Sequence, residues 1–176
     1  SLYIVEDTQL NEIFMLKQID KNKIKESSKY FDEVRNVKDI ENKNIVKINY
    51  ATYDDDNIYI SMPYYKNGSL QDILQERNLT VREIVKYSLE ILSGLYYIHK
   101  KNILHCDIKP SNILIDDYGC AVLADFGSAI NINHSGVGKL KNVYYKHIAP
   151  EQCYSSRVDV RVDIYQFGNT LYRMCN

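Results

Sequence analysis

One break between strand-like and helix-like sequence does most to limit what this chain can fold into. Residues 63–68 read Pro-Tyr-Tyr-Lys-Asn-Gly, and both the proline and the Asn-Gly pair are typical of turns. Short apolar runs separated by polar turns precede the break, and helical periodicity follows it. The pattern predicts an α+β chain. We expect a small antiparallel-sheet lobe over residues 1–62, a hinge at 63–68 and a mainly helical lobe over 69–176.

The first part is predicted to contain two hairpins with a helix between them. Leu2–Val5 and Ile13–Leu16 are apolar runs on either side of a polar turn, which indicates a pair of strands. Residues 27–41 place apolar side chains at steps of three, which favours one helical stripe. Ile45–Ile48 and Ile58–Met62 flank an Asp-rich turn and are predicted to form two further strands.

Two helix starts follow the break. Ser69 with Asp72, and Thr80 with Glu83, match the capping box, in which two side chains bond the free amides of a helix N-terminus. The second helix has apolar residues at spacings of 3, 4, 4 and 3, which are Ile84, Tyr87, Ile91, Leu95 and Ile98. After this helix, residues 113–115 and 121–123 flank a turn and predict another hairpin.

Composition excludes several classes of partner. The chain has 176 residues, 22 basic and 23 acidic, and a net charge of -1, so we expect neither nucleic acid nor a membrane surface as a partner. It has no apolar run long enough to insert into a bilayer. Its four cysteines lack the close pairs of a zinc site, which favours reduced thiols. We therefore expect a cytoplasmic protein, with the nucleus left open.

Four polar side chains around the hairpin at 113–123 carry the chemistry. Asp107 and Asn112 lie at one end of its first strand, and Asp125 lies at the far end of its second. A hairpin brings those ends together, so two carboxylates and a carboxamide converge, as a cation such as Mg²⁺ requires. Lys109 can stabilise an anionic group in transfer. An aspartate in a loop is more often a turn former, but the combination favours metal-assisted phosphate chemistry.

Three motifs in this order and spacing resemble one family, the eukaryotic-type protein kinases. They are the loop His105–Asn112, the triplet Asp125-Phe126-Gly127 and the triplet Ala149-Pro150-Glu151. The similarity runs along essentially the whole chain and implies the two-lobed protein-kinase-like fold. Residues 109–112 read Lys-Pro-Ser-Asn, which is the serine/threonine form of the loop.

The resemblance implies a role for each residue of the loop. Asp107 would orient and deprotonate the substrate hydroxyl, and Lys109 would neutralise the γ-phosphate of ATP. Asn112 and Asp125 would hold Mg²⁺. Asp163 resembles an aspartate at the start of the family's large central helix, where it anchors the backbone of the catalytic loop. Without the resemblance, Asp163 reads equally well as a helix N-cap.

The resemblance also implies a nucleotide site in the first part of the chain. Lys17 matches the lysine that binds the α- and β-phosphates, and Glu33 is the candidate for its partner on the following helix. Asp32 is the nearest competitor, but it lies on another face of that helix. The family binds adenine through backbone groups, here the carbonyl of Pro63 and the amide of Tyr65.

Apolar residues would enclose the adenine. Leu114 matches the residue that supports the ring from below, and Leu2 the one that covers it. Met62 resembles the gatekeeper, the residue that precedes the hinge. Met15 stands where the family prefers alanine, so a larger side chain narrows the expected pocket, although methionine is flexible.

Other differences from the family pattern leave open whether the chain transfers phosphate. The first glycine is Gly68, so the Gly-rich loop is missing, and the helices that usually follow the central helix are missing as well. We therefore expect a domain that is incomplete at both ends. Cys106 replaces the usual arginine beside the catalytic aspartate, and Tyr144 falls where a threonine is usual.

Two functions from different classes follow. The first is an enzyme that transfers the γ-phosphate of ATP to serine or threonine hydroxyls of protein substrates, with ATP and Mg²⁺ as cofactors. The alternative is a pseudokinase, a binding or scaffold module without phosphoryl transfer. A small-molecule kinase of related fold is a third possibility, but the segment from Asp125 to Glu151 is of the length that docks peptides. The oligomeric state is left open.

Overall fold

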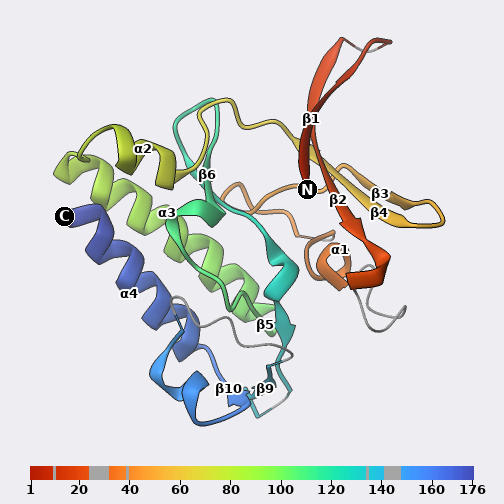
Figure 1. Cartoon of the computed structure of the whole chain (residues 1–176). Helices are drawn as coiled ribbons and strands as arrows, with labels where there is room; N and C mark the ends of the chain where they lie inside the picture. Colours follow the sequence, from red (N-terminus) through yellow and green to blue (C-terminus); the bar gives the residue numbers. More distant parts are fainter. Residues whose placement is uncertain (10, 24–31, 39, 134, 141–147) are drawn as a thin grey trace.

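A four-stranded antiparallel sheet occupies the first part of the computed structural model (Figure 1). The structure describes residues 1–9, 11–23, 32–38, 40–133, 135–140 and 148–176, apart from the side chains of Lys23, Asp32, Glu33 and Asn36. The strand order is β1-β2-β4-β3, with β1 at Leu2–Asp7, β2 at Glu12–Asp20, β3 at Tyr50–Tyr53 and β4 at Asn57–Pro63. The first predicted hairpin is confirmed, because β1 pairs antiparallel with β2.

Alternation along β4 shows which face of the sheet is inward. Ile58 and Ile60 are fully buried and Met62 is nearly so. Lys17 of β2 lies directly opposite Ile60, and side chains at paired positions point to the same face. The sheet therefore directs Lys17 inward, toward the rest of the molecule.

The prediction of a strand at residues 45–48 is wrong. The edge strand β3 is instead Tyr50–Tyr53, which pairs with β4 although Tyr50 and Tyr53 are largely exposed. The apolar run at Ile45 and Val46 is buried because it packs across the β6–β7 hairpin, and the amide of Val46 donates to the carbonyl of Leu123 at 2.8 Å. Burial between two parts of the molecule gives the same apolar signal as burial in a sheet.

Within the described residues, the helix of this region is shorter than the predicted range 27–41. Helix α1 covers Asp32–Val37 and lies beside residues 126–128. Residues 24–31 and 39 lie outside the description. Val37 is buried and Val34 is half-buried, so the predicted apolar stripe faces the core, while Ile40 follows the helix end.

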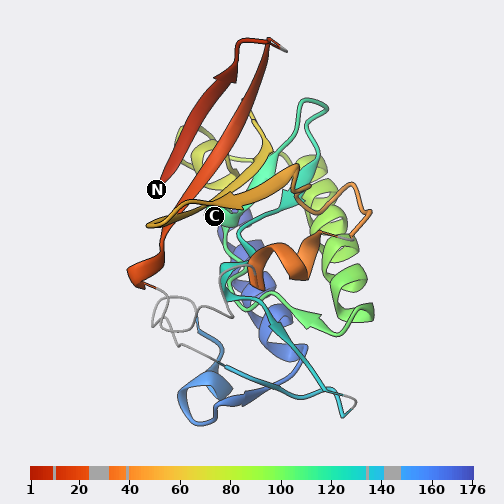
Figure 2. The same ribbon diagram turned by 90° about the vertical axis from the view of Figure 1, so that its right-hand side faces the viewer.

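The remaining elements form the helical part, with short strand pairs between the helices (Figures 1 and 2). The helices are α2 (Leu70–Glu76), α3 (Val81–Lys100) and α4 (Arg161–Cys175). The strands are β5 (Ile103–Leu104), β6 (Ile113–Ile115), β7 (Ala121–Leu123), β8 (Ile130–Asn131), β9 (Gly138–Lys139) and β10 (Arg157–Val158). The predicted hairpin is confirmed as the β6–β7 pair.

Both predicted helix starts are present. Ser69 caps α2 and Thr80 caps α3, and each capping box is complete with Asp72 and Glu83. The chain passes from the sheet to α2 through residues 64–68. The limits of the two lobes and the hinge, given above as 1–62, 63–68 and 69–176, stay a prediction. No helix in the described part of the chain is both long and apolar enough to cross a membrane.

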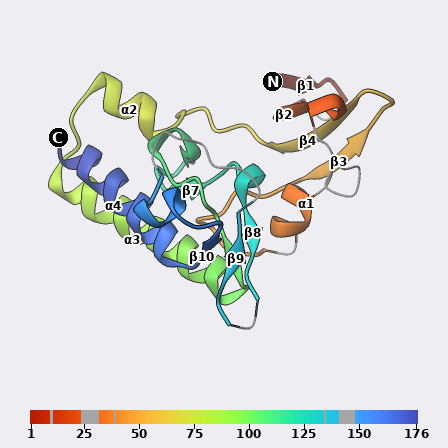
Figure 3. The ribbon, with the colours of Figure 1, turned by 60° about the horizontal axis from the view of Figure 1, so that its bottom comes forward.

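Helices α3 and α4 lie side by side and support the loops between them (Figures 1 and 3). The inward residues of α3, which include Ile91, Leu95 and Ile98, belong to the main hydrophobic core together with the β6–β7 hairpin. A second, smaller core of buried residues holds the segment after this hairpin against the start of α4 and contains Leu104, Ile130, Leu140, Ala149, Val158 and Val162.

Candidate active site

The loop at 105–112 is anchored from below by one buried carboxylate of α4. Asp163 is fully buried, and its two oxygens accept hydrogen bonds from the amides of His105 at 2.9 Å and Cys106 at 2.8 Å. The Nε2 atom of His99 lies 2.8 Å from the same carboxylate. Cys106 has φ of 63°, a conformation unfavourable for most residues other than glycine, so these bonds help to stabilise it.

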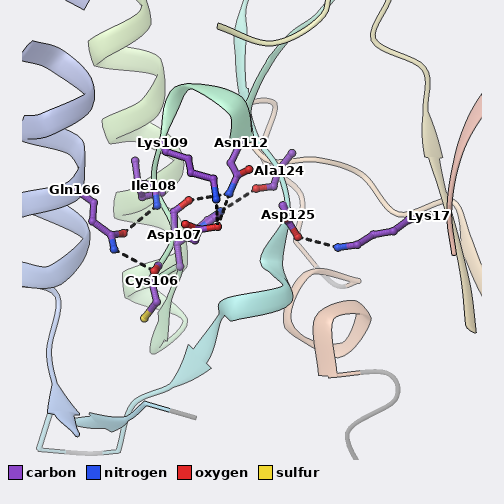
Figure 4. Close-up of polar contacts among 10 residues, drawn as sticks. Lys17, Cys106, Asp107, Ile108, Lys109, Asn112, Ala124, Asp125 and Gln166 are labelled. Carbon is purple, nitrogen blue, oxygen red and sulfur yellow. Dashed lines mark hydrogen bonds and ion pairs between the residues drawn. The ribbon is translucent and has the colours of Figure 1, made fainter. Parts of the chain in front are cut away.

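Gln166 is a second anchor, which sequence reasoning missed. Its Oε1 accepts from the amide of Ile108 at 2.9 Å, and its Nε2 donates to the carbonyl of Cys106 at 3.0 Å (Figure 4). Gln166 is buried and lies three residues after Asp163, on the same face of α4. A polar residue at that spacing from Asp163 was the available signal.

Asp107, Lys109 and Asn112 form a hydrogen-bonded cluster at the centre of the loop (Figure 4). Lys109 Nζ lies 2.7 Å from Asp107 Oδ2. Asn112 Nδ2 donates to the same oxygen at 2.8 Å and to the backbone carbonyl of Asp107 at 2.9 Å. Three of the predicted site residues are therefore brought together, and two donors fix the orientation of the Asp107 carboxylate.

The backbone connects this cluster to Asp125. The amide of Ala124 donates to the carbonyl of Asn112 at 2.9 Å, so the ends of the hairpin meet as predicted. The ring of His105 packs at 4.6 Å from the ring of Phe126, and its Nε2 lies 3.0 Å from the carbonyl of Ala124. Burial lowers the pKa of His105, which favours the neutral ring.

Asp125 faces the sheet and pairs with Lys17 across the space between the two parts of the molecule (Figure 4). Lys17 Nζ lies 2.8 Å from Asp125 Oδ1. Asp125 has φ of 61°, a region that aspartate tolerates better than most residues. Partial desolvation raises the pKa of its carboxyl, but the charge and hydrogen bond of Lys17 outweigh that effect and hold the pKa below its usual value.

The predicted partner of Lys17 on α1 stays a prediction. Glu33 belongs to α1, but its side chain lies outside the described residues. Tyr144, where the family usually has a threonine, also lies outside them. The backbone of α1 lies beside residues 126–128, directly after Asp125.

The predicted adenine residues lie on both sides of the connection between the sheet and the helices. Pro63 ends β4 opposite Phe14, and Leu114 is the central residue of β6. Tyr65 packs against the main core, and burial, with a smaller contribution from the charge of Asp116, raises the pKa of its hydroxyl to about 12.

The residues predicted to lie above the adenine, Leu2 and Met15, belong to the inward face of the sheet. Met15 lies directly opposite both Ile4 and Met62, and it shares the face of Lys17 because the two are two positions apart in the strand. Met15 is half-buried and Met62 is buried, whereas Leu2 is exposed. The two methionines are therefore neighbours at the position where the pocket is expected to be narrow.

The donor set fits a Mg²⁺ ion shared with phosphates better than a metal held by protein alone. Among the described residues, no three His, Cys, Asp or Glu side chains form a metal cluster. Mg²⁺ is usually bound by one or two carboxylates together with water and substrate phosphates. Asp125 supplies one carboxylate, and Asn112 uses its Nδ2 toward Asp107, which leaves its Oδ1 as a ligand.

Comparison with known proteins gives one consistent family. The family model described as a protein kinase domain matches residues 1–176. The chain is 33% identical to the 3-phosphoinositide-dependent protein kinase B of Dictyostelium discoideum and 33% identical to the mitogen-activated protein kinase kinase kinase YODA of Arabidopsis thaliana, with 98% of the chain covered in each case. It is 30% identical, over 90% of its length, to the serine/threonine-protein kinase CLA4 of Candida albicans. It spans 20%, 20% and 17% of the lengths of these three relatives.

Proposed function

The chain belongs to the protein kinase family, and from that premise we propose that it transfers the γ-phosphate of ATP to serine or threonine hydroxyls of protein substrates. The observation that carries this proposal is the cluster of Asp107, Lys109 and Asn112, joined through the backbone to Asp125. A loop with only a structural role would not need two charged groups and a carboxamide oriented toward one another.

Asp107 is proposed as the catalytic base. Its carboxylate is held by Lys109 and Asn112, both of which bond Oδ2, so Oδ1 is the oxygen left to accept the proton of a substrate hydroxyl. The positive charge of Lys109 lies beside the other oxygen of the same carboxylate, with Nζ 2.7 Å from Oδ2. We propose that it neutralises charge on the transferring phosphoryl group.

Asn112 and Asp125 are proposed to hold Mg²⁺ through one oxygen each, and Lys17 to bind the α- and β-phosphates. When bound, the ion would neutralise phosphate charge as it develops. The 2.8 Å pair of Lys17 with Asp125 supports this arrangement, because it puts the phosphate-binding ammonium next to the metal-binding carboxylate.

The remaining assignments concern adenine and the substrate class. We propose that the backbone of Pro63 and Tyr65 binds adenine, that Leu114 supports the ring, and that Glu33 orients Lys17. The serine/threonine assignment is supported by the Lys-Pro-Ser-Asn form of the loop and by relatives named as serine/threonine kinases. The cytoplasmic location expected from cysteine usage stays a prediction.

Phosphotransfer from ATP labelled at the γ-position tests the proposal directly. The protein is incubated with labelled ATP, Mg²⁺ and a generic protein substrate, and the labelled amino acids are separated after hydrolysis. We expect label on serine or threonine that depends on Mg²⁺. Label on tyrosine alone would contradict the serine/threonine assignment, and no label under any metal condition would favour the second function.

The pseudokinase alternative is favoured by one specific observation at Cys106. This thiol is buried, and burial raises its pKa, with the carboxylates of Asp163 and Asp107 adding to the rise. It is therefore uncharged at neutral pH, where the family usually has a cationic arginine. A pseudokinase is expected to bind partners without transferring phosphate, so the labelling experiment separates the two functions.

The Asp125→Asn change is expected to abolish the effect of Mg²⁺ on ATP binding. Asparagine tolerates the φ of 61° but lacks the charge that a divalent ion requires. In the wild-type protein, ATP with Mg²⁺ at about 100 times its dissociation constant is expected to raise the unfolding free energy by about 2.7 kcal/mol. Thermal-shift titration measures this stabilisation.

The matched control for Asp125→Asn is Asp117→Asn, on the exposed turn between β6 and β7. Asp117 pairs only with a surface lysine, Lys66, at 3.4 Å, among the described residues. This control is expected to keep the full Mg²⁺-dependent stabilisation. If Asp125→Asn kept it too, the proposed metal site would be wrong.

The charge state of Cys106 predicts that activity depends only weakly on phosphorylation of residues 128–148. The family's arginine at this position pairs with a phosphate on that segment and orders it. An uncharged thiol cannot form this pair. Phosphatase treatment is therefore expected to leave phosphotransfer nearly unchanged, whereas a Cys106→Arg variant, if it folds, should become more sensitive to it. A large loss in the wild-type protein, reversed by rephosphorylation, would contradict this prediction.

A further inference from the structure

Gln166 bonds the peptide groups on both sides of the proposed base, Asp107. Its Nε2 donates to the carbonyl of Cys106 at 3.0 Å, and its Oε1 accepts from the amide of Ile108 at 2.9 Å (Figure 4). That carbonyl belongs to the peptide group before the Cα atom of Asp107, and that amide belongs to the peptide group after it. One side chain of α4 therefore holds both of the planes between which Asp107 lies.

Two fixed peptide planes leave the backbone of Asp107 little freedom. A peptide group is planar, so the conformation of a residue is set by the two rotations, φ and ψ, that relate its flanking planes. Rotation about either bond at Asp107 would stretch or bend a hydrogen bond of Gln166. The direction of the Cα–Cβ bond depends on the same rotations, so Gln166 also fixes the direction in which the carboxylate leaves the backbone.

Asp163, the other anchor on α4, acts on an earlier part of the loop. Its oxygens accept from the amides of His105 and Cys106 at 2.9 Å and 2.8 Å, and neither amide belongs to a peptide group next to the proposed base. Cys106, with φ of 63°, lies where the two anchors meet. Asp163 therefore holds the loop up to the amide of Cys106, and Gln166 holds it from the carbonyl of Cys106 to Ile108.

The side-chain amide of Gln166 fits in one orientation only. If its two ends were exchanged, the NH₂ group would face the N–H of Ile108 and the oxygen would face the carbonyl of Cys106, so both contacts would be repulsive. Gln166 is 3% exposed, so water cannot replace a bond that is lost. The contact is therefore specific for a carboxamide, because neither a carboxylate nor an apolar side chain can form both bonds.

Asn112 completes the arrangement from the other side of the loop. Its Nδ2 donates to the backbone carbonyl of Asp107 at 2.9 Å and to Oδ2 of the same residue at 2.8 Å. The peptide group after Asp107 is therefore bonded at both polar atoms, by Asn112 at its carbonyl and by Gln166 at its amide. Gln166 acts on the backbone alone, whereas Asn112 links that backbone to the carboxylate.

We propose that Gln166 is a positioning residue for phosphotransfer, which keeps the Asp107 carboxylate oriented toward the substrate hydroxyl through the two peptide groups beside it. This inference rests on the proposed function, because it requires Asp107 to act as the base. A shift of about 1 Å in a catalytic group can slow a reaction about 10²-fold. Both polar atoms of Gln166 bond the loop, so its loss is expected to slow the chemical step and to leave the affinity for ATP unchanged.

The Gln166→Glu variant tests the role of the donor. When ionised, the introduced carboxyl accepts from Ile108 but cannot donate to Cys106. Burial and the like charge of Asp163 raise the pKa of this carboxyl, and its protonated form can donate as glutamine does. At about pH 8 and saturating ATP, we expect phosphotransfer at least about tenfold slower than in the wild-type protein. The ratio of the two rates should rise toward about pH 6, because the carboxyl becomes protonated.

Two further variants separate positioning from a general loss of stability. Gln166→Met has a similar length but no group that titrates, so it should be slow at every pH. Asn44→Asp makes the same change of carboxamide to carboxylate at another buried site, where Nδ2 of Asn44 donates to the carbonyl of Ala121 at 2.9 Å. It should lose stability, yet transfer phosphate like the wild-type protein at each pH. Thermal midpoints measured at each pH give a temperature at which all variants are folded.

Amide hydrogen exchange tests the contact independently of activity. In Gln166→Met the amide of Ile108 loses its acceptor, so it should exchange at least about tenfold faster than in the wild-type protein. The amides of His105 and Cys106 bond Asp163 and should keep their protection, so they are the internal control.

Three results would overturn the proposal. The first is unchanged exchange of the Ile108 amide in Gln166→Met, and the second is a rate ratio for Gln166→Glu that stays the same at each pH. The third is a loss of ATP affinity, measured by thermal-shift titration, that accounts for the slower transfer. If the wild-type protein transfers no phosphate, the proposed function fails instead, and exchange of the Ile108 amide alone decides whether Gln166 fixes this backbone.

Discussion

The Asp107→Asn variant is expected to transfer phosphate about 10²–10⁴-fold more slowly than the wild-type protein, while it binds ATP with unchanged affinity. In the wild-type protein, Lys109 and Asn112 both donate to Oδ2 of Asp107. Asparagine has nearly the same shape as aspartate, and its side-chain carbonyl can still accept these hydrogen bonds. The loop should therefore keep its conformation. What the variant loses is the negative charge and the ability to accept a proton from the substrate hydroxyl.

Two measurements separate loss of chemistry from loss of structure. Initial rates of phosphotransfer at saturating ATP report the chemical step, and thermal-shift titration with ATP reports binding. Asp117→Asn is the control, because it removes a carboxylate from an exposed turn ten residues away in sequence. If Asp107→Asn transferred phosphate at the wild-type rate, Asp107 would not be the base. If it also lost ATP binding, its role would lie in holding the site together.

The features that could be predicted from sequence are those determined by local contacts. Each capping box joins residues three apart, so the starts of α2 and α3 were readable at Ser69 and Thr80. The β6–β7 hairpin is equally local, and it brings Asn112 next to Ala124. The meeting of the two acidic motifs followed from that hairpin alone.

The features that could not be predicted depend on contacts between distant parts of the chain. The apolar run at Ile45 and Val46 looked like a sheet strand, but it is buried against Leu123, which is more than 70 residues away. Tyr50–Tyr53 forms the true edge strand with exposed tyrosines, so its apolar signal was weak. Alternation in sequence reports burial, and it does not say which partner provides that burial.

The same reasoning explains the two anchors of the loop at residues 105–112. The role of Asp163 was expected from the family, whereas the signal for Gln166 was its spacing of three residues from Asp163, and the amide that it bonds lies 58 residues earlier in the chain. Its amide side chain fits there because it offers both an acceptor for Ile108 and a donor for Cys106. Two anchors on one face of α4 therefore position the loop that carries Asp107.

The Asp163→Ala variant is expected to have the largest effect on stability, a loss of about 3–5 kcal/mol in unfolding free energy. Asp163 is fully buried and bonds the amides of His105 and Cys106 as well as the ring of His99. Alanine would leave two buried amides without acceptors, and each unsatisfied group costs about 1–3 kcal/mol. It would also remove the bonds that hold Cys106 at positive φ.

Urea denaturation followed by circular dichroism measures this loss, and a graded variant tests its cause. Asp163→Asn keeps one oxygen acceptor, so it should fall between alanine and the wild-type protein. Asp159→Asn, four residues earlier, alters a carboxylate that pairs with the exposed Arg161 at 2.7 Å. A surface ion pair of this kind contributes about 0–1 kcal/mol, so this control should change little.

Activity distinguishes a positioning residue from one that only supports the fold. Asp163 does not contact the proposed reacting groups; it acts through the backbone next to Asp107. At a temperature where Asp163→Asn is still fully folded, we expect slower phosphotransfer with little change in ATP affinity, because the loop is displaced while the nucleotide contacts of the sheet are kept. If Asp163→Ala were as stable as Asp159→Asn, the buried carboxylate would not be the anchor that its hydrogen bonds indicate.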